Sequence, residues 1–385
     1  MKKFRLISVL LAVITAFADF SCFSAGSAER KAEYDCKTES LSNYLLGHMS
    51  WGVKSMGLDS LQKKIENSGK QLPEVRVAVL DTGIKKSNRY LQGRYTDDGY
   101  NFIDNNTDFE DEQYHGTEVS GIIADGTSSN VKILPIKVMD KNGDGNMADT
   151  AKGIYYALDH GADVINLSLS GDDKNHTYHS LDNAIAEAVS RNAVVVVAAG
   201  NQGGDASLRY PANKDNVITV TSVNKNNTLG LLANYGSVID FALPGMNVLV
   251  PHRSLMMLDS GTSLAAPHAA AAAALIKTID KSLNQEQIYG ILKHYAVDLG
   301  DEGFDDTYGW GMIDLSNFDL NIKPVTPFRT GDVNHSGTVD INDATAVQKY
   351  LAGFKMTEFD ASLADIDGNG SVTVSDVTAL QRLLT

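Results

Sequence analysis

Four short stretches, far apart in the chain, carry residue types that together can turn a hydroxyl group into a nucleophile. They are VAVLDTG with Asp81, HGTEVSGIIA with His115, VVVVAAGN with Asn201 and GTSLAAP with Ser263. A serine hydroxyl attacks a carbonyl only when a base takes its proton, and histidine is the usual base. A carboxylate can hold that histidine in the required tautomer, and an asparagine amide can donate a hydrogen bond to the oxyanion that forms.

Each of these residues also has an ordinary structural interpretation. Aspartate and asparagine are common in turns, and a histidine can begin a helix. Ser263 precedes an alanine-rich run from Leu264 to Leu275, which predicts a closely packed helix. Ser263 is then either the cap of a core helix or a nucleophile at a helix N-terminus, where free N–H groups and the dipole favour negative charge. The four motifs together favour catalysis, because nothing structural requires all of them.

The elements that must position these residues are strands and helices that alternate from Glu74 to about Ala296. Near-continuous apolar runs predict strands buried on both faces at residues 75–80, 131–138, 163–169, 193–199 and 216–223. Residues 147–161 and 177–192 show helical spacing. Such alternation is typical of an α/β fold with a doubly wound parallel sheet, whose active sites lie at the carboxyl ends of strands.

The order Asp, His, Ser and the contexts Asp-Thr-Gly, His-Gly-Thr, Ala-Ala-Gly-Asn and Gly-Thr-Ser resemble the subtilases, the subtilisin-like serine proteases. The resemblance covers about residues 49–316, including SWGV near its start and YGWGMID near its end. It implies an endopeptidase that hydrolyses polypeptides through an acyl-enzyme, with Asp81, His115 and Ser263 as the triad and Asn201 in the oxyanion hole. A catalytically silent subtilase fold, used as a binding subunit, is the alternative.

The resemblance also implies a substrate groove. LSLSG (167–171) is similar to the strand that pairs with the substrate backbone, and NGDGN (142–146) is similar to the opposite wall. Arg209 stands where the family usually has a small residue at the base of the first specificity pocket, so we expect it to favour an acidic side chain or to shorten the pocket; an exposed loop arginine is the alternative. The expected substrate-binding residues are Ser168, Leu169, Ser170, Gly143, Gly145 and Arg209.

The chain also departs from the family pattern in two places. Subtilisins usually bind calcium through an acidic residue shortly after the Asp motif, and Tyr90 occupies that place, so we expect that site to be absent. Residues 29–48 are too few for the usual inhibitory prodomain, so we expect folding without it.

An internal repeat with a period of 33 residues follows, as GDVNHSGTVDINDATAVQKYL and ADIDGNGSVTVSDVTALQRLL. Each copy holds a loop with oxygen ligands at EF-hand spacing and a glycine, Gly337 or Gly370, at the sixth position. We expect two Ca²⁺ ions and no organic cofactor. The expected ligands are Asp332, Asn334, Ser336, Thr338, Asp340 and Asp343 in the first loop, and Asp365, Asp367, Asn369, Ser371, Thr373 and Asp376 in the second.

Neither loop ends in the usual glutamate, and prolines precede the first loop. Tandem loop-helix units over about residues 330–385 resemble dockerin domains, small all-α modules that bind cohesin modules on the scaffold proteins of cellulosomes. An EF-hand sensor that regulates the protease is the alternative, but it needs helix pairs. The two contact faces, Ile341-Asn342 with Gln348-Lys349 and Val374-Ser375 with Gln381-Arg382, are chemically alike, so we expect either to engage a cohesin.

The composition is compatible with this organisation. A chain of 385 residues that is 43% hydrophobic can hold two domains, and its formal charge of −15 argues against nucleic acid as a partner. The start of the chain has early positive charges, an apolar stretch from Leu6 to Ala18 and small residues at Gly26 and Ala28, which predict a secretion signal and no membrane anchor after its cleavage. Cys22 would leave with the signal, so Cys36 has no internal disulfide partner.

The predicted organisation is a secretion signal at residues 1–28, a short extension at 29–48, a peptidase domain at 49–320, a linker at 321–330 and the dockerin domain at 331–385. We expect the protein to be secreted and held outside the cell through cohesin.

Overall fold

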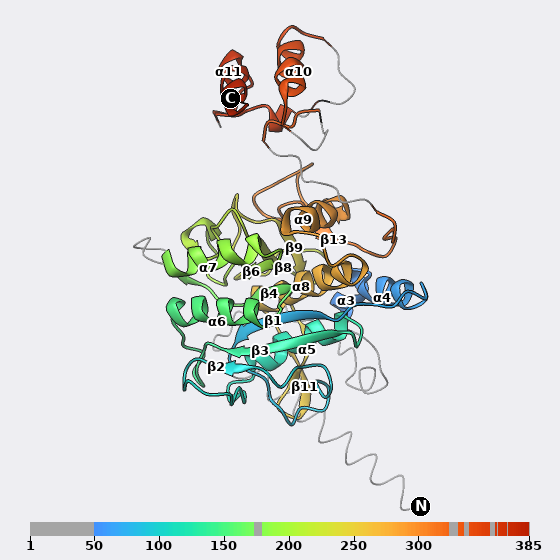
Figure 1. The fold of residues 1–385 in the computed structure, drawn as a ribbon, viewed down its shortest axis with the longest axis vertical. Helices are drawn as coiled ribbons and strands as arrows, with labels where there is room; N and C mark the ends of the chain where they lie inside the picture. Colours follow the sequence, from blue (N-terminus) through green and yellow to red (C-terminus); the bar gives the residue numbers. More distant parts are fainter. Residues whose placement is uncertain are drawn as a thin grey trace, which may run out of the picture. The chain divides into compact units, whose positions relative to one another are not determined.

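The computed structural model describes residues 50–172, 179–322, 330–334, 339–354, 359, 361–367 and 369–384 (Figure 1). The predicted secretion signal (1–28) and extension (29–48) lie outside the described residues, as do residues 323–329 of the predicted linker. Ser336 and Thr338, two of the predicted calcium ligands, also lie outside them.

A seven-stranded sheet, parallel throughout, forms the centre of the larger domain in the order β2-β3-β1-β4-β6-β8-β9. All five strands predicted from apolar runs are present, and the predicted α/β class is confirmed. The two outermost strands, β2 and β9, are short and were not predicted. The strands are β1 (Val75–Asp81), β2 (Tyr100–Asn101), β3 (Val131–Lys137), β4 (Val164–Leu167), β6 (Val194–Ala198), β8 (Ile218–Val223) and β9 (Phe241–Pro244).

Helices cover both faces of this sheet (Figure 1). Alternate residues of β1 show the two layers: Val77 and Val79 belong to one hydrophobic cluster, and Ala78 and Leu80 belong to the other. The first cluster packs against α3 (Trp51–Ser55), α4 (Leu58–Glu66), α5 (His115–Gly126), α8 (Thr262–Ile279) and α9 (Gln285–His294). The second packs against α6 (Met147–Asp159) and α7 (His179–Ser190), the two helices predicted between strands.

Helix α8 runs through the first of these layers and is buried along nearly its whole length. Its ten residues from Ala265 to Ala274 are all buried, and eight of them are alanines that present only a methyl group to their neighbours. Small side chains let the helix axis approach α5 and the sheet closely. The alanine run beside Ser263 thus has a packing reason as well as a helix-forming one.

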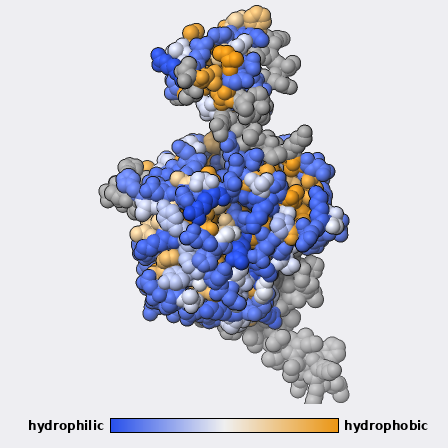
Figure 2. Space-filling view, in the orientation of Figure 1, coloured by the Kyte–Doolittle hydropathy of each residue, from blue (hydrophilic) through white to orange (hydrophobic). Residues whose placement is uncertain are grey.

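Small sheets complete the domain. β10 (Val248–His252) and β11 (Leu255–Asp259) form an antiparallel hairpin, and β10 packs against α5. β5 (Gly171–Asp172) pairs with β7 (Arg209–Tyr210), which follows the short helix η2 (Ala206–Leu208), and β12 (Ala296–Val297) pairs with β13 (Met312–Ile313). The face drawn in Figure 2 is mainly hydrophilic, with hydrophobic residues in small groups. None of the helices in the described part of the chain is both long enough and apolar enough to cross a membrane.

The C-terminal repeat forms a small helical domain with its own core, which confirms the all-α expectation. It contains α10 (Ile341–Leu351), η3 (Ala361–Leu363) and α11 (Val374–Leu383). Both long helices begin with a capping box, in which Asp340 and Asp343 or Thr373 and Asp376 exchange side-chain and backbone hydrogen bonds. Its core residues are Val333, Ala344, Ala346, Val347, Ala364, Val377 and Leu380.

The contact between α5 and the hairpin gives a stability prediction. A Cβ atom added at Gly121 would lie 2.1 Å from Pro251 Cδ, so we expect Gly121→Ala to push β10 away from α5. Overpacking of this kind costs about 1–3 kcal/mol of unfolding free energy, more than the helix propensity that alanine gains. Urea unfolding of the purified protein measures the effect. The control is Gly204→Ala, because no atom lies within 4 Å of a Cβ at that position; a more stable Gly121→Ala variant would contradict the close packing.

Candidate active site

Asp81 and His115 form a hydrogen-bonded pair in the larger domain. Asp81 is the last residue of β1 and is fully buried, and His115 is the first residue of α5. The His115 Nδ1–H group donates to Asp81 Oδ1 at 2.8 Å and lies 3.0 Å from Oδ2. Asp81 Oδ1 also accepts from the Thr82 N–H group at 2.7 Å. Because a carboxylate only accepts, the pair fixes the proton on Nδ1 and leaves Nε2 as the basic nitrogen.

The surroundings of His115 favour its charged form. Burial by itself lowers the pKa of His115, but the charge of Asp81 and the hydrogen bond to it outweigh burial and raise the pKa to about 9. The carboxyl groups of Glu118 and Asp259 add to the increase. The site therefore stabilises an imidazolium, the form that a histidine takes after it has accepted a proton.

Glycine at position 116 allows α5 to begin against the end of β1. A Cβ atom there would lie 2.3 Å from the Gly83 carbonyl oxygen and 3.1 Å from Asp81 Cβ. The Gly116 N–H group donates to Thr82 Oγ1 at 2.9 Å. The glycine and threonine of the His-Gly-Thr and Asp-Thr-Gly motifs are thus explained by the close approach that the Asp81–His115 pair requires.

The start of α5 is held by a second aspartate. Asp111 is fully buried, and it accepts from the N–H groups of Gln113, Tyr114 and Thr117 and from the Thr117 hydroxyl. These bonds satisfy donors that a helix start leaves unpaired. The His115 N–H group donates to the side chain of Gln113 at 2.8 Å.

Asn201 and Ser263 border one small space. Asn201 Oδ1 accepts from the Thr262 N–H group at 2.9 Å, which leaves the Nδ2 donors for another acceptor. A Cβ atom added at Gly261 would lie 3.2 Å from Ser263 Oγ and 3.4 Å from Asn201 Nδ2. The hydroxyl and the amide therefore face the same point next to the N-terminus of α8. Thr262 Oγ1 accepts from the Gly200 N–H group at 3.0 Å and holds the two segments together.

A proline inside α8 explains a contact of Ser168. Pro267 has no N–H group, so the Ser263 carbonyl lacks its helical donor. The Ser168 hydroxyl donates to that carbonyl at 2.7 Å, and Asn166 Nδ2 donates to Ser168 Oγ at 2.9 Å. The end of β4 is thereby tied to the first turn of α8. Helices α5 and α8, which begin at or beside His115 and Ser263, also pack against each other.

Of the other residues expected to bind substrate, Ser170 lies beside Asn201 and Gly143 lies near Gln113. Ser170 Oγ lies 3.3 Å from the position of a Cβ at Gly200, beside Asn201, and Leu169 is half-buried between Ser168 and Ser170. Gly143 and Gly145 lie in the turn after β3, and a Cβ at Gly143 would lie 3.8 Å from Gln113 Nε2, beside His115. Arg209 is half-buried on β7, in backbone register with Asp172.

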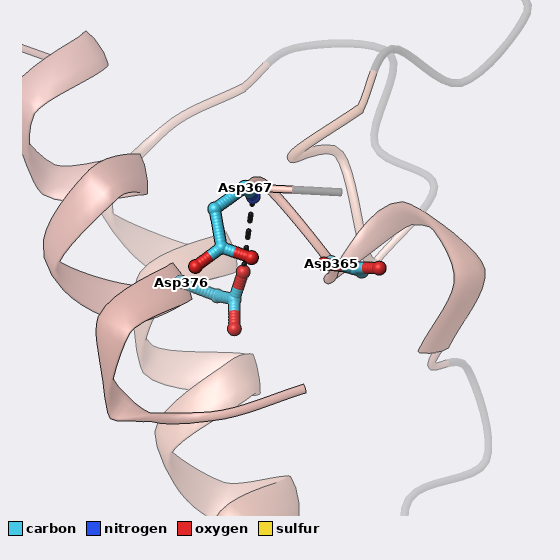
Figure 3. A group of neighbouring side chains, drawn as sticks. All are labelled: Asp365, Asp367 and Asp376. Carbon is cyan, nitrogen blue, oxygen red and sulfur yellow. Dashed lines mark hydrogen bonds between the residues drawn. The ribbon is translucent and has the colours of Figure 1, made fainter. Parts of the chain in front are cut away.

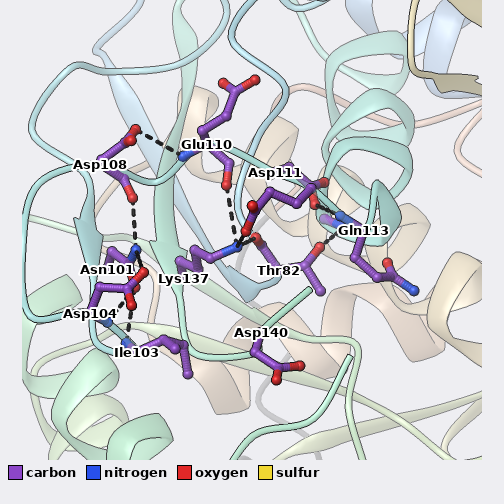
Figure 4. Close-up of polar contacts among 12 residues, drawn as sticks. Thr82, Asn101, Ile103, Asp104, Asp108, Glu110, Asp111, Gln113, Lys137 and Asp140 are labelled. Atoms are coloured by element: carbon purple, nitrogen blue, oxygen red, sulfur yellow. Dashed lines mark hydrogen bonds and ion pairs between the residues drawn. The ribbon is translucent and has the colours of Figure 1, made fainter. Parts of the chain in front are cut away.

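Lys137, a buried lysine that was not predicted from the sequence, holds the turn after Asp81 in place. Lys137 is in register with Asp81, and its Nζ donates to the Thr82 carbonyl at 2.7 Å and to the Glu110 carbonyl at 3.2 Å (Figure 4). The loop next to it is closed by Asn101, whose side chain contacts Asp104 and the Asp108 carbonyl. The signal available in the sequence was a lysine at the carboxyl end of the strand, directly after the apolar residues Ile133–Ile136.

Three further neighbours of His115 were also missed: Glu118, His252 and Asp259. Glu118 lies one turn after His115 on α5 and contacts His252 on β10. The spacing of three residues on a helix placed Glu118 on the same side as His115 and could have revealed it.

In the second repeat, oxygen atoms of Asp365, Asp367 and Asp376 all lie within 4.8 Å of one another (Figure 3). Asp376 Oδ1 accepts from the N–H groups of Ile366 and Asp367, so the loop folds back onto the start of α11. Converging carboxylate oxygens suit Ca²⁺, which prefers oxygen ligands. Asn369 and Ser371 are exposed on the same loop, and the Thr373 hydroxyl donates to Asp376 Oδ2 at 3.0 Å.

The first repeat is built in the same way. Asp332 and Asp343 are buried, and Asp343 accepts from the N–H groups of Asn334 at 3.2 Å and Asp340 at 2.8 Å. Burial raises the pKa of Asp343, and the charges of Asp332 and Asp340 add to the increase. A cation would relieve that repulsion, so these residues fit the same ion.

Comparison with known proteins agrees with this geometry. The subtilase family model matches residues 73–311, and the dockerin type I domain model matches residues 330–385. The chain is 34% identical over 310 residues to the cell wall-associated protease of Bacillus subtilis (strain 168), which is 73% of this chain and 34% of that protein. It is 37% identical over 245 residues to the thermophilic serine proteinase of Bacillus sp. (strain AK1), which is 60% of this chain and 59% of that protein.

A solved structure of a lanthipeptide protease superposes with a TM-score of 0.63 at 25% identity, over 72% of this chain and 96% of that one. The chain spans about a third of the length of the first curated relative and about three fifths of the second. The subtilase match nevertheless covers more than half of this chain. The chain therefore belongs to the subtilase family, and it carries a dockerin type I domain at residues 330–385.

Proposed function

We propose that the protein is a secreted endopeptidase in which Ser263 is the nucleophile, His115 the general base and Asp81 the residue that orients the base. The observation that carries this proposal is the hydrogen bond of 2.8 Å from His115 Nδ1 to the buried Asp81 carboxylate. It selects the tautomer whose Nε2 can take a proton from a hydroxyl. The peptidase domain spans 49–320 in this proposal, and residues 1–28 direct secretion.

The reaction follows from these roles. Ser263 Oγ attacks the peptide carbonyl carbon while His115 takes its proton, and the oxyanion accepts hydrogen bonds from Asn201 Nδ2 and the Ser263 N–H group. The imidazolium then gives its proton to the leaving amine, and the acyl group remains on Ser263. A water molecule attacks this ester with His115 again as base, which releases the acid and restores the hydroxyl. Because only neutral His115 can begin the cycle, its raised pKa shifts activity toward alkaline pH.

The substrate would lie as an extended strand between the two walls. The segment Ser168–Ser170 continues from β4 and passes Gly200, and the turn with Gly143 and Gly145 lies on the side of Gln113. Backbone groups of both segments would pair with the peptide on either side of the scissile bond. Arg209 follows η2 and would lie at the base of the first pocket, where its charge would attract a glutamate or aspartate side chain.

We further propose that the dockerin domain binds one Ca²⁺ ion in each loop and attaches the enzyme to a cohesin module outside the cell. Ile341 and Val374 occupy equivalent first positions of α10 and α11 and are 60% and 72% exposed. Exposed apolar residues at two equivalent positions support two similar contact faces.

Substitution of the nucleophile tests the proposed activity. Ser263→Ala should reduce kcat on casein by at least about 10³-fold, because no other group can form the acyl-enzyme. A fluorophosphonate probe should label the unmodified protein and not the variant. Ser254→Ala, an exposed serine in the β10–β11 turn, is the matched control. Hydrolysis at the same rate by Ser263→Ala, or absence of hydrolysis and labelling in the unmodified protein, would favour a silent binding subunit instead.

A peptide library tests the role of Arg209. The unmodified enzyme should cleave preferentially after acidic residues, and Arg209→Gly should shift the kcat/KM ratio toward large apolar residues by about 10–10²-fold. Arg191→Gly, which changes an exposed arginine directly after α7, should leave the ratio unchanged. A strong preference of the unmodified enzyme for large aromatic residues would rule out the proposed pocket.

Removal of calcium tests the docking domain in the full chain. Residues 331–385 hold eight acidic and three basic side chains, a charge of −5, so chelation should unfold this module through self-repulsion and abolish cohesin binding. Binding to an immobilised cohesin, with calcium and with a chelator, is the measurement.

The same assay tests the two faces. Ile341→Asp alone and Val374→Asp alone should each keep cohesin binding, and the double variant should lose it. Complete loss in one single variant would show that only one face is used, and binding in the presence of the chelator would contradict the role of calcium.

A further inference from the structure

The backbone carbonyl of Ser263, the proposed nucleophile, has a hydrogen-bond donor from outside its own helix. In a regular helix this carbonyl accepts from the N–H group four residues later, but that residue is Pro267, which has no N–H group. The Ser168 hydroxyl donates to the carbonyl instead, at 2.7 Å. Ser168 directly follows β4 and lies 95 positions before Ser263 in the chain. The bond therefore depends on how β4 and α8 pack against each other.

The orientation of the Ser168 hydroxyl is fixed by a second side chain, that of Asn166 on β4. A hydroxyl has one hydrogen, and the Ser263 carbonyl accepts it. Ser168 Oγ in turn accepts from Asn166 Nδ2 at 2.9 Å. Ser168 is 5% exposed and Asn166 is fully buried, and Asn166 Oδ1 has no hydrogen-bond partner among the described residues. An unsatisfied buried acceptor costs stability, which points to a functional reason for this arrangement.

The two ends of this bond belong to the two sides of the proposed reaction. Ser263 is the second residue of α8, and its hydroxyl and N–H group are the proposed nucleophile and an oxyanion donor. Ser168 begins the segment Ser168–Ser170, along which the peptide substrate would lie. A shift of the first turn of α8 relative to the end of β4 would change the distance from the hydroxyl to the peptide carbonyl. The bond between Ser168 and Ser263 opposes such a shift.

We propose that Ser168 is a positioning residue whose hydroxyl supplies the donor that Pro267 lacks and thereby holds Ser263 at the attack distance from the bound peptide. Asn166 keeps the hydroxyl in the orientation that this role needs. The inference rests on the proposed function of Ser263 as the nucleophile. The Ser168 hydroxyl neither touches the substrate nor transfers a proton in this proposal, since only the backbone of Ser168 pairs with the peptide.

Pro267 makes the first turn of α8 dependent on β4. It is buried, and its ring prevents the regular helical bond to the Ser263 carbonyl. Alanine at position 267 would restore an N–H group at the place from which a helix normally donates to that carbonyl. A carbonyl oxygen has two lone pairs, so it can accept from this N–H group with or without the Ser168 hydroxyl. Substitutions of Ser168 and Pro267 therefore form a double-mutant cycle in which the second change supplies the donor that the first removes.

The experiment combines Ser168→Ala with Pro267→Ala. Ser168→Ala alone should lower kcat on a peptide substrate by about tenfold or more and keep KM within about twofold, because the nucleophile is displaced while the peptide-binding backbone remains. Pro267→Ala alone should keep kcat within about threefold of the unmodified enzyme. The double variant should regain kcat to within about threefold of Pro267→Ala. The matched control is Ser120→Ala, which removes a buried hydroxyl that has no partner in the described part of the chain and should leave kcat unchanged.

The rate of labelling by a small fluorophosphonate separates positioning of the nucleophile from binding of the peptide. The probe reacts with Ser263 and needs no pairing with the segment Ser168–Ser170. Ser168→Ala should slow labelling by about the same factor as kcat, and addition of Pro267→Ala should restore the rate. Unchanged labelling together with a reduced kcat/KM would place the effect of Ser168 in peptide binding and overturn the proposal. Equal losses of kcat in Ser168→Ala and in the double variant would overturn it as well.

Melting temperatures show whether each variant is folded. If Ser168→Ala does not fold, the double variant should fold, because the buried Ser263 carbonyl again has a donor; a double variant that is equally unfolded would overturn the proposal. The proposed function fails separately. An unmodified protein that neither labels nor hydrolyses peptides would refute the role of Ser263 and this inference with it. An active enzyme in which the effects of the two substitutions simply add would refute the inference alone.

Discussion

A carboxylate kept away from water, at the end of the inner strand β1, sets the geometry of the larger domain. Asp81 is fully buried, and burial of a charge is tolerated only when donors surround it. His115 and the Thr82 N–H group supply those donors. Lys137, in register on the neighbouring strand, fixes the Thr82 carbonyl and thereby the turn after the carboxylate. The same hydrogen bond that satisfies Asp81 prepares His115 to accept a proton, so stability and chemistry depend on one contact.

This contact is possible only because the surrounding backbone segments carry small residues. Gly116 lies so close to the Gly83 carbonyl that no side chain fits between them. The alanine-rich α8, which begins beside Ser263, packs closely against α5. Motifs that look like catalytic signatures are in this way partly packing signatures. Glycine and alanine let the backbone segments pack closely. This packing brings Asp81 and His115 within hydrogen-bonding distance.

Much of the fold could be predicted from the sequence because strands buried on both faces leave continuous apolar runs. The runs at 75–80 and 193–199, for example, correspond to β1 and β6. The short outer strands β2 and β9 left no such signal, since two to four residues are too few to show a pattern. Glu118, His252 and Asp259 escaped prediction for another reason. They lie on α5 and on a hairpin more than a hundred residues later, and only the tertiary fold brings them together.

In the dockerin domain, one carboxylate in each repeat serves two purposes. Asp343 and Asp376 stand at the last proposed ligand position of their loops and also complete the capping boxes of α10 and α11. An ion drawn to either loop therefore meets an oxygen donor already held in place by backbone amides, and its arrival reinforces the nucleus from which the helix grows. Under the proposed calcium binding, coordination and helix nucleation are a single cooperative event, so each repeat orders as a unit when its ion binds.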